Sequence, residues 1–178
     1  MKKAAIIYLS LTGNTEKVAE SIQRGLTEGG FQTSLFKLVD AGEVDFYNFD
    51  LICLGTPSYN WLPPKPMEKY LRGMFNRYKN EGRIKPGAPA LPGKYALVFC
   101  TYSGPHTGIR EAIPAGKYVG QFFEHLGFTV VDEWYVLSEF HGSEENSTLG
   151  RMGNIKGLPS KDDLERIKSC AVNLTQRL

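Results

Sequence analysis

The feature that most constrains the fold is the alternation of short apolar runs with segments of helical periodicity. Runs that are apolar at consecutive positions are typical of strands covered on both faces, as in a parallel sheet. Four runs are close to this pattern, at 4–9, 50–55, 94–101 and 129–137. A fifth segment, 32–38, alternates apolar and polar residues and suits the edge of a sheet. We therefore expect a mainly buried parallel sheet with five strands.

Helical segments lie between and after these strands. The first has apolar residues at spacings of three, four and seven and ends at Gly29 and Gly30. The expected helices are 14–28, 66–78, 109–126 and 161–178. This order predicts an α/β sheet with right-handed crossovers. The length of 178 residues favours one domain, which we expect to cover 1–178.

Two longer segments, 80–93 and 138–160, interrupt the alternation and are rich in glycine, proline or polar residues. Loops of this length are often functional lids or partner surfaces, and passive excursions are nearly as common. Both interpretations therefore stay open for the two segments.

Composition and charge exclude several classes of protein. The net charge of +2 is too small to indicate a nucleic-acid partner, and no stretch approaches the length of a membrane span. The apolar run 4–9 is shorter than an export signal requires. Cys53, Cys100 and Cys170 form no C-x-x-C pair, which fits a reducing compartment, and three scattered histidines make a poor metal site. We expect a cytoplasmic protein without a metal.

A cluster of small and hydroxylated residues stands where the first strand ends and the first helix begins. The first N–H groups of a helix lack partners and favour an anion, and Gly13 permits close backbone approach. Four polar side chains add donors without any positive charge, although an ordinary helix cap is the alternative. The patterns G-x-x-x-x-G-K-[ST] and G-x-G-x-x-G are absent, which weighs against nucleotide hydrolysis and a dinucleotide site. The cluster reads Ser10, Leu11, Thr12, Gly13, Asn14 and Thr15.

This cluster resembles the phosphate loop of the flavodoxin family, which holds the phosphate of FMN. The segment "YNFDLICLGTPSYNWLPP" at 47–64 is similar to the third strand of that family and the loop after it. The segment "KYALVFCTYSGPHTG" at 94–108 is similar to the fourth strand and its loop. The resemblance covers essentially the whole chain. It implies a flavodoxin-like, doubly wound, five-stranded parallel sheet with strand order 2-1-3-4-5.

In such a sheet the ligand binds beyond the carboxyl ends of the strands, at the switch point between strands 1 and 3. The resemblance thus implies that the phosphate loop and the loops after strands 3 and 4 hold FMN. Tyr59 and Trp61 are the expected stacking residues on one side of the ring and Tyr102 on the other, with plain packing as the alternative for each. The expected contacts in the two ring loops are Thr56, Pro57, Ser58, Tyr59, Asn60, Trp61, Thr101, Tyr102, Ser103 and Gly104.

The charges of the two ring loops depart from those of typical flavodoxins, which place acidic residues around the flavin. Neither 56–64 nor 101–109 contains an acid, and Lys65 and Arg110 follow them directly. Negative charge disfavours a reduced, anionic flavin, so its absence predicts a less strongly reducing flavin. Acidic residues of the segment 138–160 would reverse this expectation if they folded over the ring.

Two main functions follow from the resemblance. The first is electron transfer by an FMN-binding protein that docks with a redox partner protein. The alternative is an oxidoreductase, namely an FMN-dependent NAD(P)H quinone or flavin reductase. The segment 104–108 also resembles these reductases, which are usually oligomers. A binding module with this fold and no flavin is a third reading. His106 and His141 lie on loops near the expected flavin, and neither is assigned a catalytic role.

Overall fold

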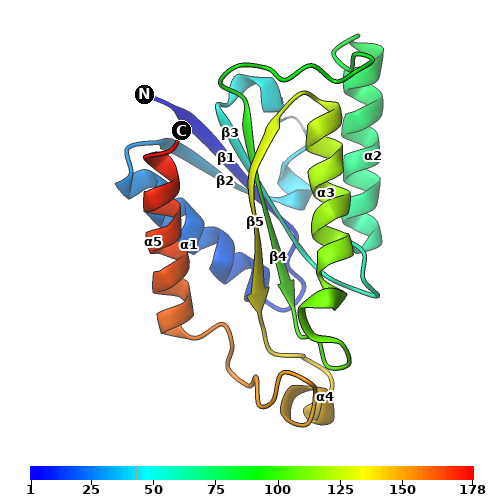
Figure 1. Ribbon diagram of the computed structural model, residues 1–178, viewed down its shortest axis with the longest axis vertical. Helices are drawn as coiled ribbons and strands as arrows, with labels where there is room; N and C mark the ends of the chain where they lie inside the picture. Colours follow the sequence, from blue (N-terminus) through cyan, green and yellow to red (C-terminus); the bar gives the residue numbers. More distant parts are fainter. Residues whose placement is uncertain (43) are drawn as a thin grey trace.

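The centre of the computed structural model, which describes residues 1–42 and 44–178, is a five-stranded parallel sheet (Figure 1). The strand order is β2-β1-β3-β4-β5, and every neighbouring pair is parallel. The predicted α/β fold and strand order are confirmed, and the alternating segment forms the edge strand β2. The strands are β1 Lys3–Tyr8, β2 Gln32–Lys37, β3 Leu51–Pro57, β4 Tyr95–Tyr102 and β5 Thr129–Leu137.

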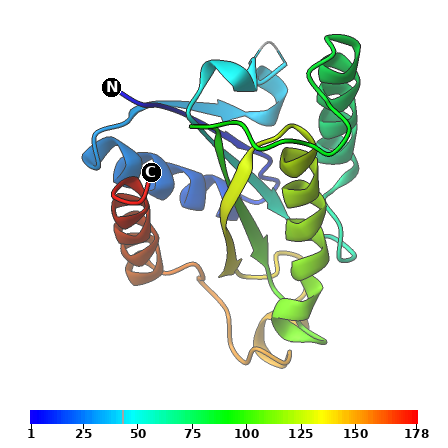
Figure 2. The ribbon, with the colours of Figure 1, turned by 45° about the horizontal axis from the view of Figure 1, so that its top comes forward.

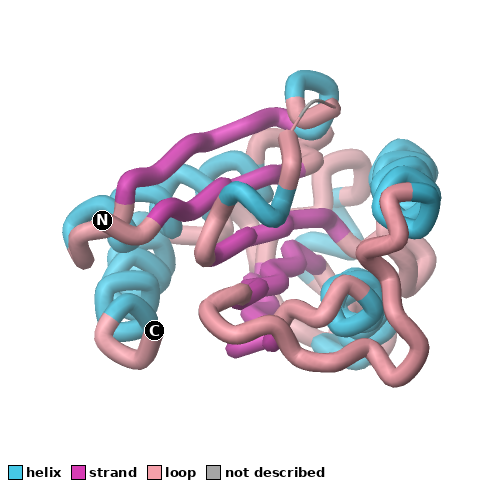
Figure 3. Tube along the Cα trace, turned by 90° about the horizontal axis from the view of Figure 1, so that it is seen from above, coloured by secondary structure: helices cyan, strands magenta, loops and turns pink. Residues whose placement is uncertain are grey.

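Helices cover both faces of the sheet, as the view from above shows (Figure 3). On one face lie α1 (Asn14–Glu28) and α5 (Lys161–Thr175), and on the other lie α2 (Lys65–Asn80) and α3 (Ile113–His125). Successive residues of the central strands enter the two cores in turn: Ile6 packs toward α1 and α5, whereas Ile7 packs toward α2 and α3. Both faces are buried, which explains why these strands are apolar at consecutive positions.

The structure differs from the expected helices at two places. The segment 109–126 is split into a 3-10 turn, Gly108–Glu111, and α3, because Pro114 lacks an N–H and takes its place in the first turn of a new helix. A short helix, α4 (Glu144–Thr148), forms within 138–160, where we expected a loop. Figure 2 shows this segment beyond the carboxyl ends of β4 and β5.

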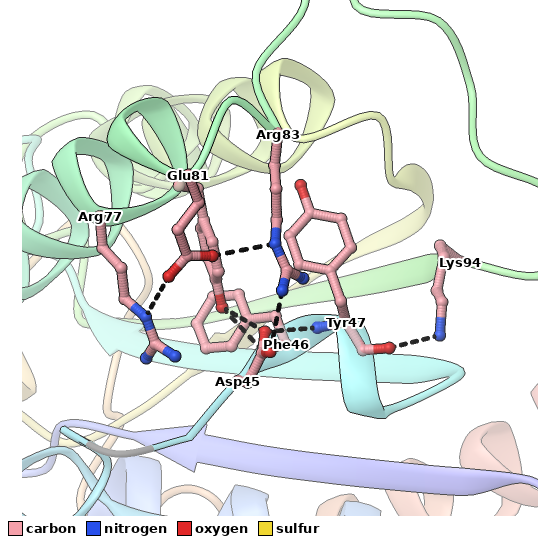
Figure 4. Close-up of polar contacts among 8 residues, drawn as sticks. Asp45, Phe46, Tyr47, Arg77, Glu81, Arg83 and Lys94 are labelled. Carbon is pink, nitrogen blue, oxygen red and sulfur yellow. Dashed lines mark hydrogen bonds and ion pairs between the residues drawn. The ribbon is translucent and has the colours of Figure 1, made fainter.

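A polar network connects the segment before β3 to the end of α2 (Figure 4). It lies at the amino ends of the strands, opposite the loops that follow the strands. The Arg83 guanidinium lies 4.5 Å from the centre of the Tyr47 ring and 3.5 Å from the Asp45 carboxylate. Lys94 Nζ donates to the Tyr47 carbonyl at 2.8 Å.

No helix among the described residues is long and apolar enough to cross a bilayer.

Candidate functional site

The segment 10–15 forms the turn that joins β1 to α1. Gly13 is the N-cap of α1 with a φ of 92°, and a Cβ there would meet nothing within 4 Å. Glycine is therefore favoured here by the left-handed backbone conformation and not by crowding around a Cβ. Ser10 Oγ accepts the Gly13 N–H at 3.1 Å, and no described side chain caps the first turn of α1. The first N–H groups of the helix are left free to bind an anion.

Two of the four polar side chains expected to face a phosphate are engaged elsewhere. Asn14 is 4% exposed, and its Nδ2 donates to the Glu139 carbonyl at 3.3 Å. Thr15 is 2% exposed, and its hydroxyl lies 2.8 Å from the Thr101 hydroxyl. Thr12 is exposed. The side chains of Asn14 and Thr15 thus tie this turn to neighbouring loops, and its backbone N–H groups become the main free donors.

Thr101, at the carboxyl end of β4, joins the loops that follow three strands. Its hydroxyl bonds Thr15 of the turn after β1, and its carbonyl accepts the Ser58 N–H of the loop after β3 at 2.9 Å. Thr101 is almost wholly buried, as is Thr56 at the end of β3. The structure therefore brings together the three loops that the sequence singled out.

The loop after β3 carries a tight turn at Tyr59–Leu62 that the sequence analysis did not predict. The Tyr59 N–H donates to the Leu62 carbonyl at 2.9 Å, and the Leu62 N–H donates back at 3.1 Å. Asn60 and Trp61 have φ of 48° and 69°, the type I′ arrangement. Asparagine tolerates this region, whereas a bulky tryptophan is strained there. Tyr59 and Trp61 are 47% and 61% exposed, so the turn presents two aromatic side chains.

Tyr102 does not offer a comparable ring face. It is 8% exposed and belongs to a buried cluster with Ala112 and Ala115, and burial raises its pKa. Gly104 has a φ of 56°, and a Cβ there would lie 2.6 Å from the Gly108 carbonyl oxygen, so only glycine fits.

Glu111 contacts both ring loops, a role that the sequence analysis missed. Its Oε1 accepts the N–H groups of His106 and Thr107 at 2.8 and 2.5 Å. Its backbone carbonyl accepts the Ser58 hydroxyl. Glu111 lay within a segment predicted as one helix, so no sequence signal pointed to these contacts.

The segment 138–160 packs beside the loop after β4. The Arg151 N–H donates to the Pro105 carbonyl at 2.7 Å. The Glu139 carboxylate accepts the Gly157 N–H at 2.9 Å, so this acid is turned into its own segment.

Comparison with known proteins agrees with this architecture. The family model described as Flavodoxin matches residues 6–168. An NAD(P)H dehydrogenase (quinone) from Archaeoglobus fulgidus is 22% identical over 94% of this chain and 93% of its own length. A flavodoxin from Clostridium beijerinckii is 40% identical over 28% of this chain and 36% of its own.

Solved structures share the fold at low identity. Oxidised flavodoxin 1 from Bacillus cereus superposes with a TM-score of 0.68 and 18% identity, covering 99% of both chains. A WrbA-like flavodoxin from Agrobacterium tumefaciens superposes with a TM-score of 0.64 and 15% identity, covering 99% of both chains. With the family model matched over most of its length, the chain belongs to the flavodoxin family of FMN-binding redox proteins.

Proposed function

We propose that FMN binds where the loops after β1, β3 and β4 meet, with its phosphate on the backbone N–H groups, free among the described residues, of Leu11, Thr12, Asn14 and Thr15. The observation that carries this proposal is the first turn of α1, which no described side chain caps and which begins at Gly13. A helix N-terminus attracts an anion through these N–H groups and through its dipole. Thr101 joins this turn to both ring loops, so the loops that bind the phosphate and the isoalloxazine ring of FMN would be held together by the same residue.

The ring would lie against the aromatic turn 59–62. Strained backbone persists where it serves a ligand or a switch, and Trp61 combines a left-handed backbone with an exposed ring. The N–H groups of Ser103 and Gly104 have no acceptor among the described residues and are donors for the polar edge of the ring. FMN supplies the electron-transfer chemistry when bound, and the protein supplies binding and orientation.

The protein would act either as an electron carrier for a redox partner protein or as an NAD(P)H-dependent quinone reductase. The carrier is supported by the family match, and the exposed turn 59–62 would allow a partner to reach the ring edge. The reductase is supported by the quinone dehydrogenase that matches 94% of this chain. It is also supported by the lack of acids in 57–64.

Titration of the apoprotein with FMN and with riboflavin tests the binding site. FMN should bind far more tightly, because only FMN carries the phosphate, whereas equal affinities would refute the phosphate assignment. Rapid mixing of the FMN-loaded protein with NADH or NADPH then separates the two functions. Fast loss of flavin absorbance would support the reductase, and an inert flavin would support the carrier.

A further inference from the structure

The loop after β4 has few bonds of its own that define its shape. Gly104 and Gly108 have φ of 56° and 70°, so the loop contains two residues of high conformational freedom. Its internal backbone bond runs from the Gly108 N–H to the Gly104 carbonyl at 3.0 Å. A loop of this kind needs an outside contact to hold one conformation.

Two outside contacts hold the loop after β4: the Arg151 N–H donates to the Pro105 carbonyl at 2.7 Å, and the Glu111 side chain binds the next two residues. A single oxygen, Oε1, accepts the N–H groups of both His106 and Thr107. Hydrogen bonds to a carboxylate are shorter and stronger than neutral ones. With these two N–H groups occupied, the free N–H groups of the loop among the described residues are those of Ser103 and Gly104. The hydrogen bonds to Glu111 therefore leave Ser103 and Gly104 as the part of the loop whose N–H groups can bind a ligand.

The same residue also holds the loop after β3. The Ser58 hydroxyl donates to the Glu111 carbonyl, and Ser58 directly precedes the aromatic turn 59–62. Side chain and backbone of one half-buried residue thus contact the two loops that would flank the ring.

We propose that Glu111 is a positioning residue that holds the loops after β3 and β4 in the geometry that receives the isoalloxazine ring. This inference rests on the proposed FMN site. Without the carboxylate, the part of the loop after Pro105 would have to be ordered at the moment of binding, and affinity would fall. The loss should concern the ring alone, because the phosphate turn 10–15 has its own anchors at Thr101 and Glu139.

Two substitutions separate the hydrogen bonds of Glu111 from its charge. Glu111→Gln keeps an oxygen that accepts both N–H groups, whereas Glu111→Ala removes it. In the apoprotein, hydrogen exchange of the His106 and Thr107 N–H groups should be about tenfold faster in Glu111→Ala than in the wild type and nearly unchanged in Glu111→Gln. Glu124→Ala, an exposed glutamate of α3, is the matched control and should change neither exchange in 103–111 nor flavin affinity.

Flavin titration of the same variants tests the link to the ring. Glu111→Ala should weaken FMN and riboflavin by the same factor, about tenfold or more, and Glu111→Gln by less than about threefold. Thr12→Val should weaken FMN alone. Unchanged exchange with unchanged affinities in Glu111→Ala would overturn the proposal, as would a loss of FMN affinity without a loss of riboflavin affinity.

Ser58→Ala keeps the proposal testable if Glu111→Ala does not fold. It removes one arm of the contact and should weaken both flavins in parallel by a smaller factor, whereas unchanged affinities would refute the joint hold on the two loops. Wild-type protein that binds neither flavin would refute the proposed function and with it this role. Flavin binding by the wild type together with unaffected Glu111 and Ser58 variants would refute the positioning role alone.

Discussion

Replacement of Trp61 by glycine separates the backbone strain of the 59–62 turn from the contact made by the ring. A left-handed backbone costs a residue with a Cβ about 1–2 kcal/mol, and the second central position of a type I′ turn favours glycine. Glycine also lowers the free energy of unfolding by about 0.5–1 kcal/mol, because the unfolded chain is more flexible with glycine. Because 61% of Trp61 is exposed, its loss removes little packing. The apoprotein of Trp61→Gly should therefore be as stable as the wild type or more stable by up to about 1 kcal/mol.

Flavin binding should change in the opposite direction. Stacking on an aromatic ring contributes about 0.5–1.5 kcal/mol beyond buried area, so Trp61→Gly should weaken FMN about two- to tenfold. Trp61→Phe keeps both the ring and the strain, and it should bind FMN nearly as well as the wild type with no gain in stability. A flavin next to Trp61 should also fluoresce less in the wild type than in Trp61→Gly.

Urea unfolding of the apoproteins and fluorescence titration with FMN measure the two effects. A loss of more than about 1 kcal/mol in Trp61→Gly would show that the ring packs into the fold and that the strain argument is wrong. Unchanged affinity and fluorescence would place the ring away from the flavin and leave Tyr59 as the aromatic contact.

Three further predictions concern buried and paired groups. Thr15→Val should destabilise the apoprotein by about 1–3 kcal/mol in urea unfolding, because it leaves the buried Thr101 hydroxyl without its partner. The pKa of Glu16 lies below its usual 4.5 because the Tyr8 hydroxyl donates to it, so its stabilisation is present above pH 4.5 and is lost as pH falls through the lower folded value. Glu16→Gln should flatten this acid dependence of the free energy of unfolding. In native protein only Cys170 should react with a thiol reagent, because burial raises the pKa of the other two thiols, and all three should react in denaturant.

The fold could be predicted from the sequence because its main signals are periodic. Consecutive apolar residues predict strands buried on both faces, and the bounds expected for α1 and β5 agree with the structure. The short helix α4 was missed because five residues contain too little of a helical period to be seen. The break before α3 depends on Pro114, which the pattern of apolar residues does not register.

The site could be predicted only as far as its loops. The topology places the carboxyl ends of β1, β3 and β4 together, whereas the direction of each side chain depends on partners far along the chain, such as Glu139 for Asn14. Tyr102 is an exception that the sequence could have revealed. It continues the alternation of Val98 and Cys100, which face the helices on the α3 side, so the strand period predicts a buried ring.

The charges around the proposed site bear on the choice between carrier and reductase. Two acids beside the proposed site accept backbone N–H groups: Glu111 accepts two N–H groups of the loop after β4, and Glu139 accepts the Gly157 N–H. The residues 57–64 contain no acid. The accepted N–H dipoles partly offset the charge of Glu111, so the second electron of a reduced, anionic flavin here would be opposed less than in a site ringed by free carboxylates. Electron uptake in two steps of similar potential suits hydride chemistry, so the charge arrangement favours the reductase.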